Sequence, residues 1–197
     1  NGIPEMFQPG GKKTAHPSVL VVGRLVPVKR HDLMVRAAAL ARSEVPDLTL
    51  TIVGEGYERE HIQSVVDHLG AHDWVELTGH LREDELVDRY QRAWVVSSAS
   101  AREGWGLSLT EAAACGTPAV ATRIAGHRDA VRDGESGLLT DGTADALAAG
   151  LVRILRDDPL RDRLRRGALD RAGALSWERT ALGVMDVLAR QAAPRTP

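Results

Sequence analysis

Two cationic side chains in one short loop are the first candidates for chemistry in this sequence. Arg24 and Lys29 lie within residues 23–30, directly before a helical pattern that begins near His31. Gly23 opens the loop and lets a backbone approach closely, and anions are favoured beside the amino terminus of a helix. The loop therefore suits a diphosphate. Short basic loops are also common on solvated surfaces, so this segment alone leaves both interpretations open.

Two glutamates with seven residues between them form the second candidate. Glu103 lies in a loop, and Glu111 lies one turn inside the helical pattern that follows. Gly104 and Gly106 leave room there for a ligand. Three backbone amides would then face a bound phosphate, those of Gly106, Leu107 and Ser108. Because carboxylates accept several hydrogen bonds, Glu111 suits a ribose diol and Glu103 a sugar ring. Taken alone, the two could equally be a helix-face carboxylate and a solvated loop charge.

A third loop, residues 122–129, could close a sugar pocket. It follows an apolar run and contains Gly126 before a short predicted helix. A glycine in the turn from a strand to a helix is also ordinary architecture, so this loop carries less weight than the other two.

Short apolar runs rich in β-branched residues would position these loops. The runs are continuous rather than alternating, which is typical of strands covered on both faces of a parallel sheet. They span Val19–Val22, Leu50–Val53, Trp74–Leu77, Trp94–Ser97 and Ala119–Thr122. Helical patterns alternate with them at His31–Glu44, Glu58–Leu69, Glu83–Arg92 and Leu107–Cys115. This alternation predicts an α/β fold, a Rossmann-like doubly wound parallel sheet, whose ligands bind beyond the carboxyl ends of the strands.

The sequence becomes purely helical after a last apolar segment at residues 137–140. Further helical patterns lie at residues 144–156, 160–172 and 177–191. Ser176 is expected to cap the last of these, and we expect the additional C-terminal helices to pack on the sheet edge. A chain of 197 residues suits one substantial core. We therefore predict a single domain over residues 1–192 and a disordered tail over residues 193–197.

The composition excludes some functional classes. Lys and Arg number 25 against 27 Asp and Glu, a net charge of -2, so no global basic field would hold a nucleic-acid backbone. No run of 18 apolar residues or signal-peptide pattern occurs, and the chain begins abruptly in a loop-like segment, as a piece of a longer protein would. The one cysteine, Cys115, is expected to be a small buried hydrophobe in a reduced, cytoplasmic setting.

Taken together, the motifs resemble the C-terminal domain of the retaining glycosyltransferases of the GT-B fold, family GT4, the group 1 glycosyltransferases. The two glutamates with seven intervening residues are the most specific element when the basic loop precedes them at this distance. The matching stretches, in chain order, are Asn1-Gly2-Ile3-Pro4 with Phe7 and Pro9, Gly23-Arg24-Leu25 with Lys29, Val53-Gly54-Glu55-Gly56, Gly79-His80-Leu81, Glu103-Gly104-Trp105-Gly106 through Glu111, Gly116-Thr117-Pro118 and Gly137-Leu138-Leu139.

The resemblance implies a nucleotide-sugar donor site for a hexose, with no cofactor and no metal. It implies that Arg24 and Lys29 neutralise the donor diphosphate as it leaves, which would stabilise developing charge. No Asp-x-Asp triplet, the usual metal-bridging pair of the other large glycosyltransferase fold, occurs in the chain. Similarity further assigns Glu103 to the transferred sugar and Glu111 to the ribose. The amides of Leu107 and Ser108 would bind the phosphate or sugar.

The nucleotide base would lie against residues 79–82, which include Leu81, by the same resemblance. The sequence departs from the family pattern at a few positions. Arg30 follows the lysine where glycine is common, Trp105 replaces a commoner Phe, and residues 125–129 have Ala-Gly and Asp where Gly-Gly and Glu are common. These departures concern the identity of the sugar more than the fold.

A GT-B enzyme has two Rossmann-like domains, and the acceptor binds mainly to the N-terminal one. That domain is absent from this sequence, so we expect no catalysis by the chain alone. Residues 177–191 resemble the family's C-terminal helix, which crosses back to the partner domain, so its apolar face is expected to be exposed. The acceptor could be a lipid-linked molecule or a small molecule. A lipid-linked acceptor would go with a peripheral association of the full-length protein with a membrane.

Other functional classes fit the sequence less well. His61, His68 and His72 have near-helical spacing, but Gly70 interrupts the helix and nothing completes a metal-ligand set. A dinucleotide-dependent oxidoreductase would need a Gly-x-Gly-x-x-Gly fingerprint after the first strand, and none occurs. Two alternatives stay open: a non-catalytic nucleotide-sugar-binding module, and a related GT-B enzyme such as a sugar-phosphate or sucrose-type synthase or a nucleotide-sugar epimerase.

Overall fold

Parallel strands form one sheet at the centre of the computed structural model, which describes residues 2–192. The strands lie in the order β3-β2-β1-β4-β5-β6, and every pairing is parallel. Their bounds are β1 Ser18–Val22, β2 Thr49–Val53, β3 Val75–Gly79, β4 Val95–Ser98, β5 Ala119–Thr122 and β6 Gly137–Thr140. This is the strand order of the doubly wound nucleotide-binding sheet, so the predicted fold class is confirmed.

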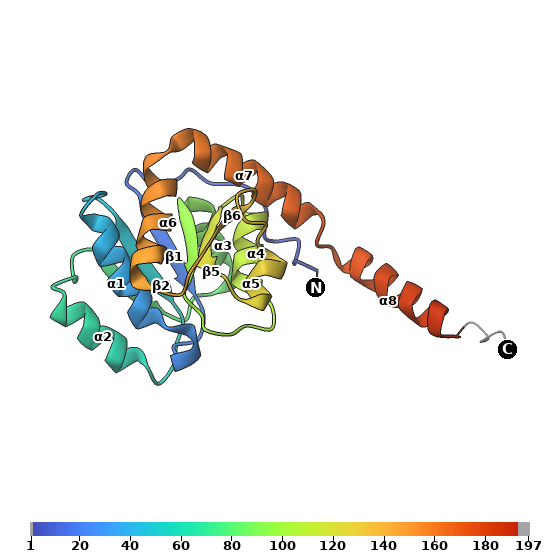
Figure 1. Ribbon diagram of the computed structural model, residues 1–197, viewed down its shortest axis with the longest axis horizontal. Helices are drawn as coiled ribbons and strands as arrows, with labels where there is room; N and C mark the ends of the chain where they lie inside the picture. The colour runs from blue at the N-terminus through green and yellow to red at the C-terminus, as the bar shows by residue number, and fades with distance from the viewer. Residues whose placement is uncertain (1, 193–197) are drawn as a thin grey trace.

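Helices cover both faces of the sheet (Figure 1). One layer contains α1 (His31–Arg42), α2 (Arg59–His68) and α6 (Ala144–Arg156), and the other contains α3 (Glu83–Arg92), α4 (Leu107–Ala114) and α5 (Ala125–Ala130). Adjacent residues of β1 face opposite layers. Val19 and Val21 pack in the core beneath α1 and α6, whereas Leu20 packs in the core beneath α3 and α4. Burial on both faces explains why the strand sequences are continuously apolar.

The C-terminal helices differ from one another in how they pack. The expectation of edge packing is wrong for α6, which lies on the sheet face against α1, because its apolar stripe of Leu147, Leu151 and Ile154 needs a buried partner. Helix α7 (Asp158–Gly173) contacts α4, α6 and β6, and so connects the two layers.

Helix α8 (Trp177–Ala192) extends away from the rest of the domain (Figure 1). The side-chain oxygen of Ser176 accepts a hydrogen bond from the amide of Arg179 at 3.1 Å, which confirms the predicted cap. The large apolar side chains of α8 are exposed, namely Trp177, Leu182, Val184, Met185, Val187 and Leu188. The expected exposure of this apolar face is therefore confirmed. The tail predicted at residues 193–197 lies outside the described residues.

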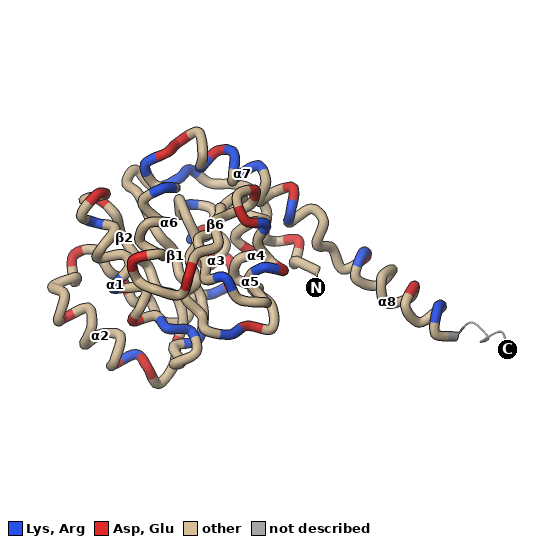
Figure 2. The backbone as a smooth tube through the Cα atoms, viewed as in Figure 1, with Lys and Arg blue, Asp and Glu red and all other residues tan. Residues whose placement is uncertain are grey.

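Positive and negative residues are both spread along the described part of the chain (Figure 2). Lys and Arg are interspersed with Asp and Glu along the longer helices (Figure 2), and the net charge is -2. Cys115 is buried, as predicted, and burial raises the pKa of its thiol to about 12. No helix within residues 2–192 combines the length and the apolar character that a membrane span requires.

Candidate functional site

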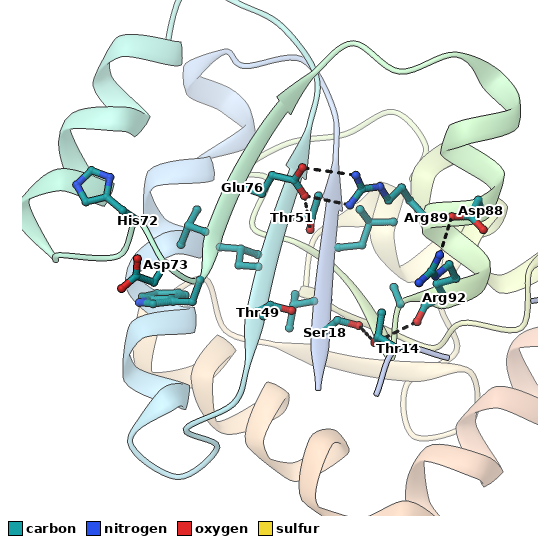
Figure 3. Close-up of a pocket in the computed structure, with 16 residues that line it drawn as sticks. Thr14, Ser18, Thr49, Thr51, His72, Asp73, Glu76, Asp88, Arg89 and Arg92 are labelled. Carbon is teal, nitrogen blue, oxygen red and sulfur yellow. Dashed lines mark hydrogen bonds and ion pairs between the residues drawn. The ribbon is translucent and has the colours of Figure 1, made fainter. Parts of the chain in front are cut away.

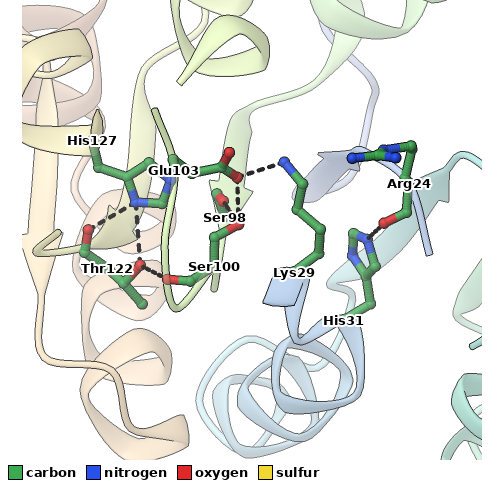
Figure 4. A network of polar contacts seen from close by, with 8 residues as sticks. All are labelled: Arg24, Lys29, His31, Ser98, Ser100, Glu103, Thr122 and His127. Carbon is green, nitrogen blue, oxygen red and sulfur yellow. Dashed lines mark hydrogen bonds and ion pairs between the residues drawn. The ribbon is translucent and has the colours of Figure 1, made fainter. Parts of the chain in front are cut away.

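The basic loop and the glutamate loop meet at the point where the sheet changes direction. Strands β1 and β4 are neighbours, and the chain leaves them toward opposite faces, so their loops diverge at the switch point, where sheets of this kind bind ligands in a crevice. The amine of Lys29 lies 2.5 Å from Oε1 of Glu103 across this crevice (Figure 4). The amide of Ala101 also donates to the carbonyl of Val28 at 2.8 Å. The structure thus brings together two predicted site residues that are 74 positions apart.

A tight turn places Lys29 in the crevice. Residues Pro27–Lys29 form a short 3-10 helix that the sequence did not reveal, and α1 begins two residues after Lys29. Arg30 between them has a φ of 51°, in the left-handed region where a side chain is strained. The guanidinium of Arg30 donates to the carbonyl of Gly142 at 2.5 Å, which ties this turn to the loop after β6.

A buried histidine holds the backbone of the basic loop. Nε2 of His31 lies 3.1 Å from the carbonyl oxygen of Arg24, and because a carbonyl only accepts, Nε2 carries the proton. Burial lowers the pKa of His31, which keeps the ring neutral. The side chain of Arg24 itself is exposed and extends to the same side as Lys29 (Figure 4).

Glu103 is a partly buried carboxylate held in its ionised form. Its Oε1 accepts hydrogen bonds from Lys29 at 2.5 Å and from the hydroxyl of Ser100 at 2.7 Å. Burial acts to raise the pKa of Glu103, but these two hydrogen bonds and the nearby positive charge outweigh it, so the pKa is lowered. The carboxylate therefore stays charged at neutral pH and is fixed in direction by two donors.

The amino terminus of α4 follows directly after Glu103. Gly106 caps the helix without a side-chain hydrogen bond, and the space around the α-carbon of Gly104 is open. The amide of Leu107 donates to the carbonyl of Trp105 at 3.1 Å, whereas the amide of Ser108 has no backbone acceptor outside α4 among the described residues. The helix end is thus accessible to an anion, with Ser108 better placed to donate than Leu107.

Glu111 has a buried partner that the sequence did not predict. Its Oε2 accepts a hydrogen bond from the hydroxyl of Tyr90 on α3 at 2.9 Å. Burial raises the pKa of Glu111, and the bond from Tyr90 opposes that shift. A tyrosine on the apolar face of a helical pattern has the same sequence signal as an ordinary core aromatic, so only the packing of α3 against α4 identifies it.

The loops after β2 and β3 complete the edge of the site. Gly54 has a φ of 144°, and a Cβ at this position would lie 2.0 Å from the carbonyl oxygen of Gly23. Only glycine allows the loops after β1 and β2 to approach this closely. Leu81, one of the residues expected to lie against the base, follows β3 and packs partly buried against the core beneath α3 and α4.

The third loop lies against Glu103. Gly126 falls inside α5 rather than before it, and a Cβ at Gly126 would lie 2.5 Å from the carbonyl oxygen of Glu103. The next residue, His127, is buried, and its Nδ1 lies 2.8 Å from the carbonyl oxygen of Thr122. The only sequence signal for this histidine is its place in the turn after β5, and that signal is weak because such turns are ordinary architecture.

A separate groove of about 510 Å³ lies away from these loops (Figure 3). It runs over the amino ends of β1, β2 and β3 beside α3. Both of its arginines are already paired with carboxylates, since Arg89 lies 3.0 Å from Glu76 and Arg92 lies 3.7 Å from Asp88. The groove also lies at the amino ends of the strands, whereas ligands of such sheets bind beyond the carboxyl ends, so the loops at the switch point are the better candidate.

The histidines considered for a metal site are dispersed. His61 faces Asp32 at 3.9 Å and His72 faces Asp67 at 3.6 Å, each as a separate exposed pair. Over residues 2–192, no group of three or more His, Cys, Asp or Glu side chains is placed to hold a metal ion.

Comparison with known proteins assigns the family. The family described as "Glycosyl transferases group 1" matches residues 2–171, which is most of the chain. The chain belongs to the group 1 glycosyltransferases. It is 42% identical over 178 residues to a D-inositol 3-phosphate glycosyltransferase of Acidothermus cellulolyticus, covering 86% of this chain and 40% of that protein. This glycosyltransferase domain thus spans about 40% of the length of the curated relatives it matches.

Solved structures agree with the family assignment. The sucrose-phosphate synthase of Thermosynechococcus elongatus superposes with a TM-score of 0.82 and 32% identity, over 95% of this glycosyltransferase domain and 50% of that chain. A pneumococcal O-GlcNAc transferase in complex with UDP and GlcNAc gives a TM-score of 0.83 and 26% identity, over 95% and 38% of the two chains. The resemblance to the C-terminal domain of a GT-B glycosyltransferase is confirmed.

Proposed function

We propose that this glycosyltransferase domain binds the nucleotide-sugar donor, from which a hexose is transferred with retention of configuration. The observation that carries the proposal is the 2.5 Å contact between Lys29 and Glu103 at the switch point of the sheet. It places a cation and a carboxylate side by side, as recognition of a diphosphate joined to a sugar requires. A solved relative with the same fold was crystallised with UDP and GlcNAc.

In this proposal, Arg24 and Lys29 neutralise the diphosphate as it leaves. The amine of Lys29 has three protons and uses one for Glu103, so it can also donate to a phosphate oxygen. Arg24 is free to turn toward the same group because its side chain is exposed, while His31 fixes its carbonyl. Fixed cations stabilise charge on the leaving group, and we propose that no metal or other cofactor is needed.

The remaining groups hold the rest of the donor. Glu103 accepts hydrogen bonds from the transferred sugar, and Glu111, positioned by Tyr90, accepts them from the ribose. The open end of α4, at Gly106 and the amides of Leu107 and Ser108, receives phosphate oxygens. Gly23 and Gly104 leave the space this needs, and Leu81 lies against the base.

The chain is proposed to act with a second domain that binds the acceptor. It spans about 40% of the length of its curated relatives, and the apolar face of α8 is exposed and suits such a partner. The domain alone is then expected to bind the donor without transferring sugar. D-inositol 3-phosphate occurs in the names of the curated relatives and is therefore one acceptor to test. We predict a cytoplasmic location. Peripheral contact of the full-length protein with a membrane is compatible with that prediction.

A second candidate is synthesis of a sucrose-type product, because the sucrose-phosphate synthase is 32% identical over nearly the whole chain. Incubation of the full-length protein with nucleotide sugars and either D-inositol 3-phosphate or fructose 6-phosphate would separate the two. The product formed identifies the acceptor class. Release of free nucleotide without a glycosylated product from either acceptor would contradict both.

Calorimetric titration of the 197-residue chain with UDP, GDP and ADP tests donor binding. We expect one nucleotide to bind, with the affinity unchanged by EDTA. Glu111→Ala and Lys29→Ala should each weaken binding about tenfold or more, because each removes a charged hydrogen-bond partner. Glu60→Ala and Arg36→Ala, exposed changes on α2 and α1, are the matched controls. A folded chain that binds none of the three nucleotides would overturn the proposal.

A further inference from the structure

His127 is a buried histidine beside the proposed sugar site that none of the roles above uses. Its side chain is 1% exposed. Nδ1 lies 2.8 Å from the carbonyl oxygen of Thr122 and 3.2 Å from the hydroxyl of the same residue. Because the carbonyl can only accept, Nδ1 carries the proton. Nε2 is then the acceptor nitrogen of the ring, and it makes no hydrogen bond within the described residues.

The ring is tied to Glu103 through a short chain of hydrogen bonds. The hydroxyl of Thr122 donates to the carbonyl of Ser100 at 2.6 Å, and the hydroxyl of Ser100 donates to Glu103 at 2.7 Å. Gly126 packs directly on the backbone of Glu103, since a Cβ there would lie 2.5 Å from its carbonyl oxygen. Figure 4 shows the second ring nitrogen on the side of Glu103. Glu103 and His127 are therefore held in one frame.

His127 is neutral at physiological pH in this setting. Burial lowers its pKa most, and Lys29 acts in the same direction. The hydrogen bond to Thr122 and the negative charge of Glu103 oppose the shift without reversing it. A neutral imidazole protonated on Nδ1 presents a lone pair on Nε2, so it can accept a hydrogen bond from a hydroxyl but cannot pair with a phosphate.

We propose that His127 recognises the transferred sugar: its Nε2 accepts a hydrogen bond from one sugar hydroxyl while Glu103 accepts from a neighbouring one. This inference rests on the proposed donor-binding function and deepens it. The contact with Thr122 needs only the N–H donor at Nδ1, and the side-chain amide of an asparagine would supply such a donor. Within the described residues, Nε2 has no partner and is not among the buried unpartnered side-chain atoms, so it reaches the surface, where a bound hydroxyl can donate to it.

Two substitutions separate the structural nitrogen from the ligand-binding one. His127→Asn keeps a donor near the place of Nδ1 and removes the acceptor at Nε2. His127→Gln places an amide near the position of Nε2. The measurement is the ratio of two dissociation constants on the same chain, one for a nucleotide sugar and one for its nucleotide alone. The pairs are UDP-glucose or UDP-N-acetylglucosamine with UDP, GDP-mannose with GDP, and ADP-glucose with ADP.

For whichever nucleotide binds, we expect His127→Asn to raise this ratio about tenfold, the loss of roughly one hydrogen bond. The affinity for the nucleotide alone should stay within twofold of wild type, and His127→Gln should recover part of the loss. An unchanged ratio in a folded His127→Asn chain that still binds the nucleotide would overturn this inference and leave the donor site standing. Failure of the wild-type chain to bind any nucleotide would overturn both.

Discussion

The amine of Lys29 lies 2.5 Å from Oε1 of Glu103, and this contact joins the loops after β1 and β4. Both side chains are mostly buried, with 23% and 15% of their surfaces exposed. Removal of either partner would leave a partly desolvated charge unpaired, and such a charge is costly. Removing one partner is therefore expected to lower stability as well as to disturb the proposed donor site.

Lys29→Met removes the cation and keeps the length of the side chain. We expect the free energy of unfolding at neutral pH to fall by about 1–3 kcal/mol, because Glu103 loses its charged partner. The pKa of Glu103 is lowered in the folded state, so its contribution is present above the unfolded pKa and is lost as pH falls through the folded pKa. Urea unfolding should show wild type and variant converging in acid. A difference in unfolding free energy between wild type and variant that stays constant at every pH would contradict this account. The double variant Lys29→Met with Glu103→Gln is the control.

Tyr90→Phe removes the hydroxyl that positions Glu111. We expect the free energy of unfolding to fall by about 1 kcal/mol. Nucleotide affinity should fall several-fold, because the carboxylate loses its fixed direction. Tyr57→Phe is the matched control, since Tyr57 is 76% exposed. Equal effects of the two substitutions on nucleotide affinity in calorimetry would show that Tyr90 does not position Glu111.

Glu111→Gln should separate binding from stability. Burial raises the pKa of Glu111, so its contribution to stability is present below the unfolded pKa and is lost as pH rises through the folded pKa. The neutral amide avoids that loss and still accepts from Tyr90. We expect a gain of about 0.5–2 kcal/mol in unfolding free energy at neutral pH together with weaker nucleotide binding. Urea unfolding and calorimetry measure the two quantities, and a stability loss larger than that of Glu60→Gln would contradict the reasoning.

Gly54→Ala tests the close approach of two loops. The new Cβ would meet the carbonyl oxygen of Gly23 at 2.0 Å with φ at 144°, so we expect a loss of about 2–4 kcal/mol in thermal or urea unfolding. Gly70→Ala is the control, because Gly70 has a φ of 59° but open space around it. The control should cost only about 1 kcal/mol. Equal losses would show that the contact with Gly23 is not what requires glycine.

Leu182→Ser with Leu188→Ser tests whether α8 stabilises this domain. Both side chains are exposed, so we expect the unfolding free energy to change by about 0.5 kcal/mol or less. Leu164→Ala on α7 is the contrast, because Leu164 is fully buried and its truncation should cost about 2–5 kcal/mol. A large loss from the α8 substitutions would show that the helix packs on the domain in solution.

The elements were largely predictable because their signals are local. The bounds of β5, β6, α3 and α6 agree with the patterns read from the sequence, and most others differ by one or two residues. Continuous apolar runs predicted strands buried on both faces, and the observed sheet has two cores. The error over α6 has a physical cause: an apolar stripe predicts burial without saying which surface covers it.

The sequence by itself determined the fold class, the family motifs and the loops in which the site residues lie, because periodicity and glycine spacing are properties of short segments. Only the tertiary structure decided the partners. Residues 29 and 103, 90 and 111, and 100 and 122 meet because the strand order brings the ends of β1, β4 and β5 together and packs α3 against α4. Hydrogen bonds, and the pKa values that depend on them, follow from distance in space, which no local pattern contains.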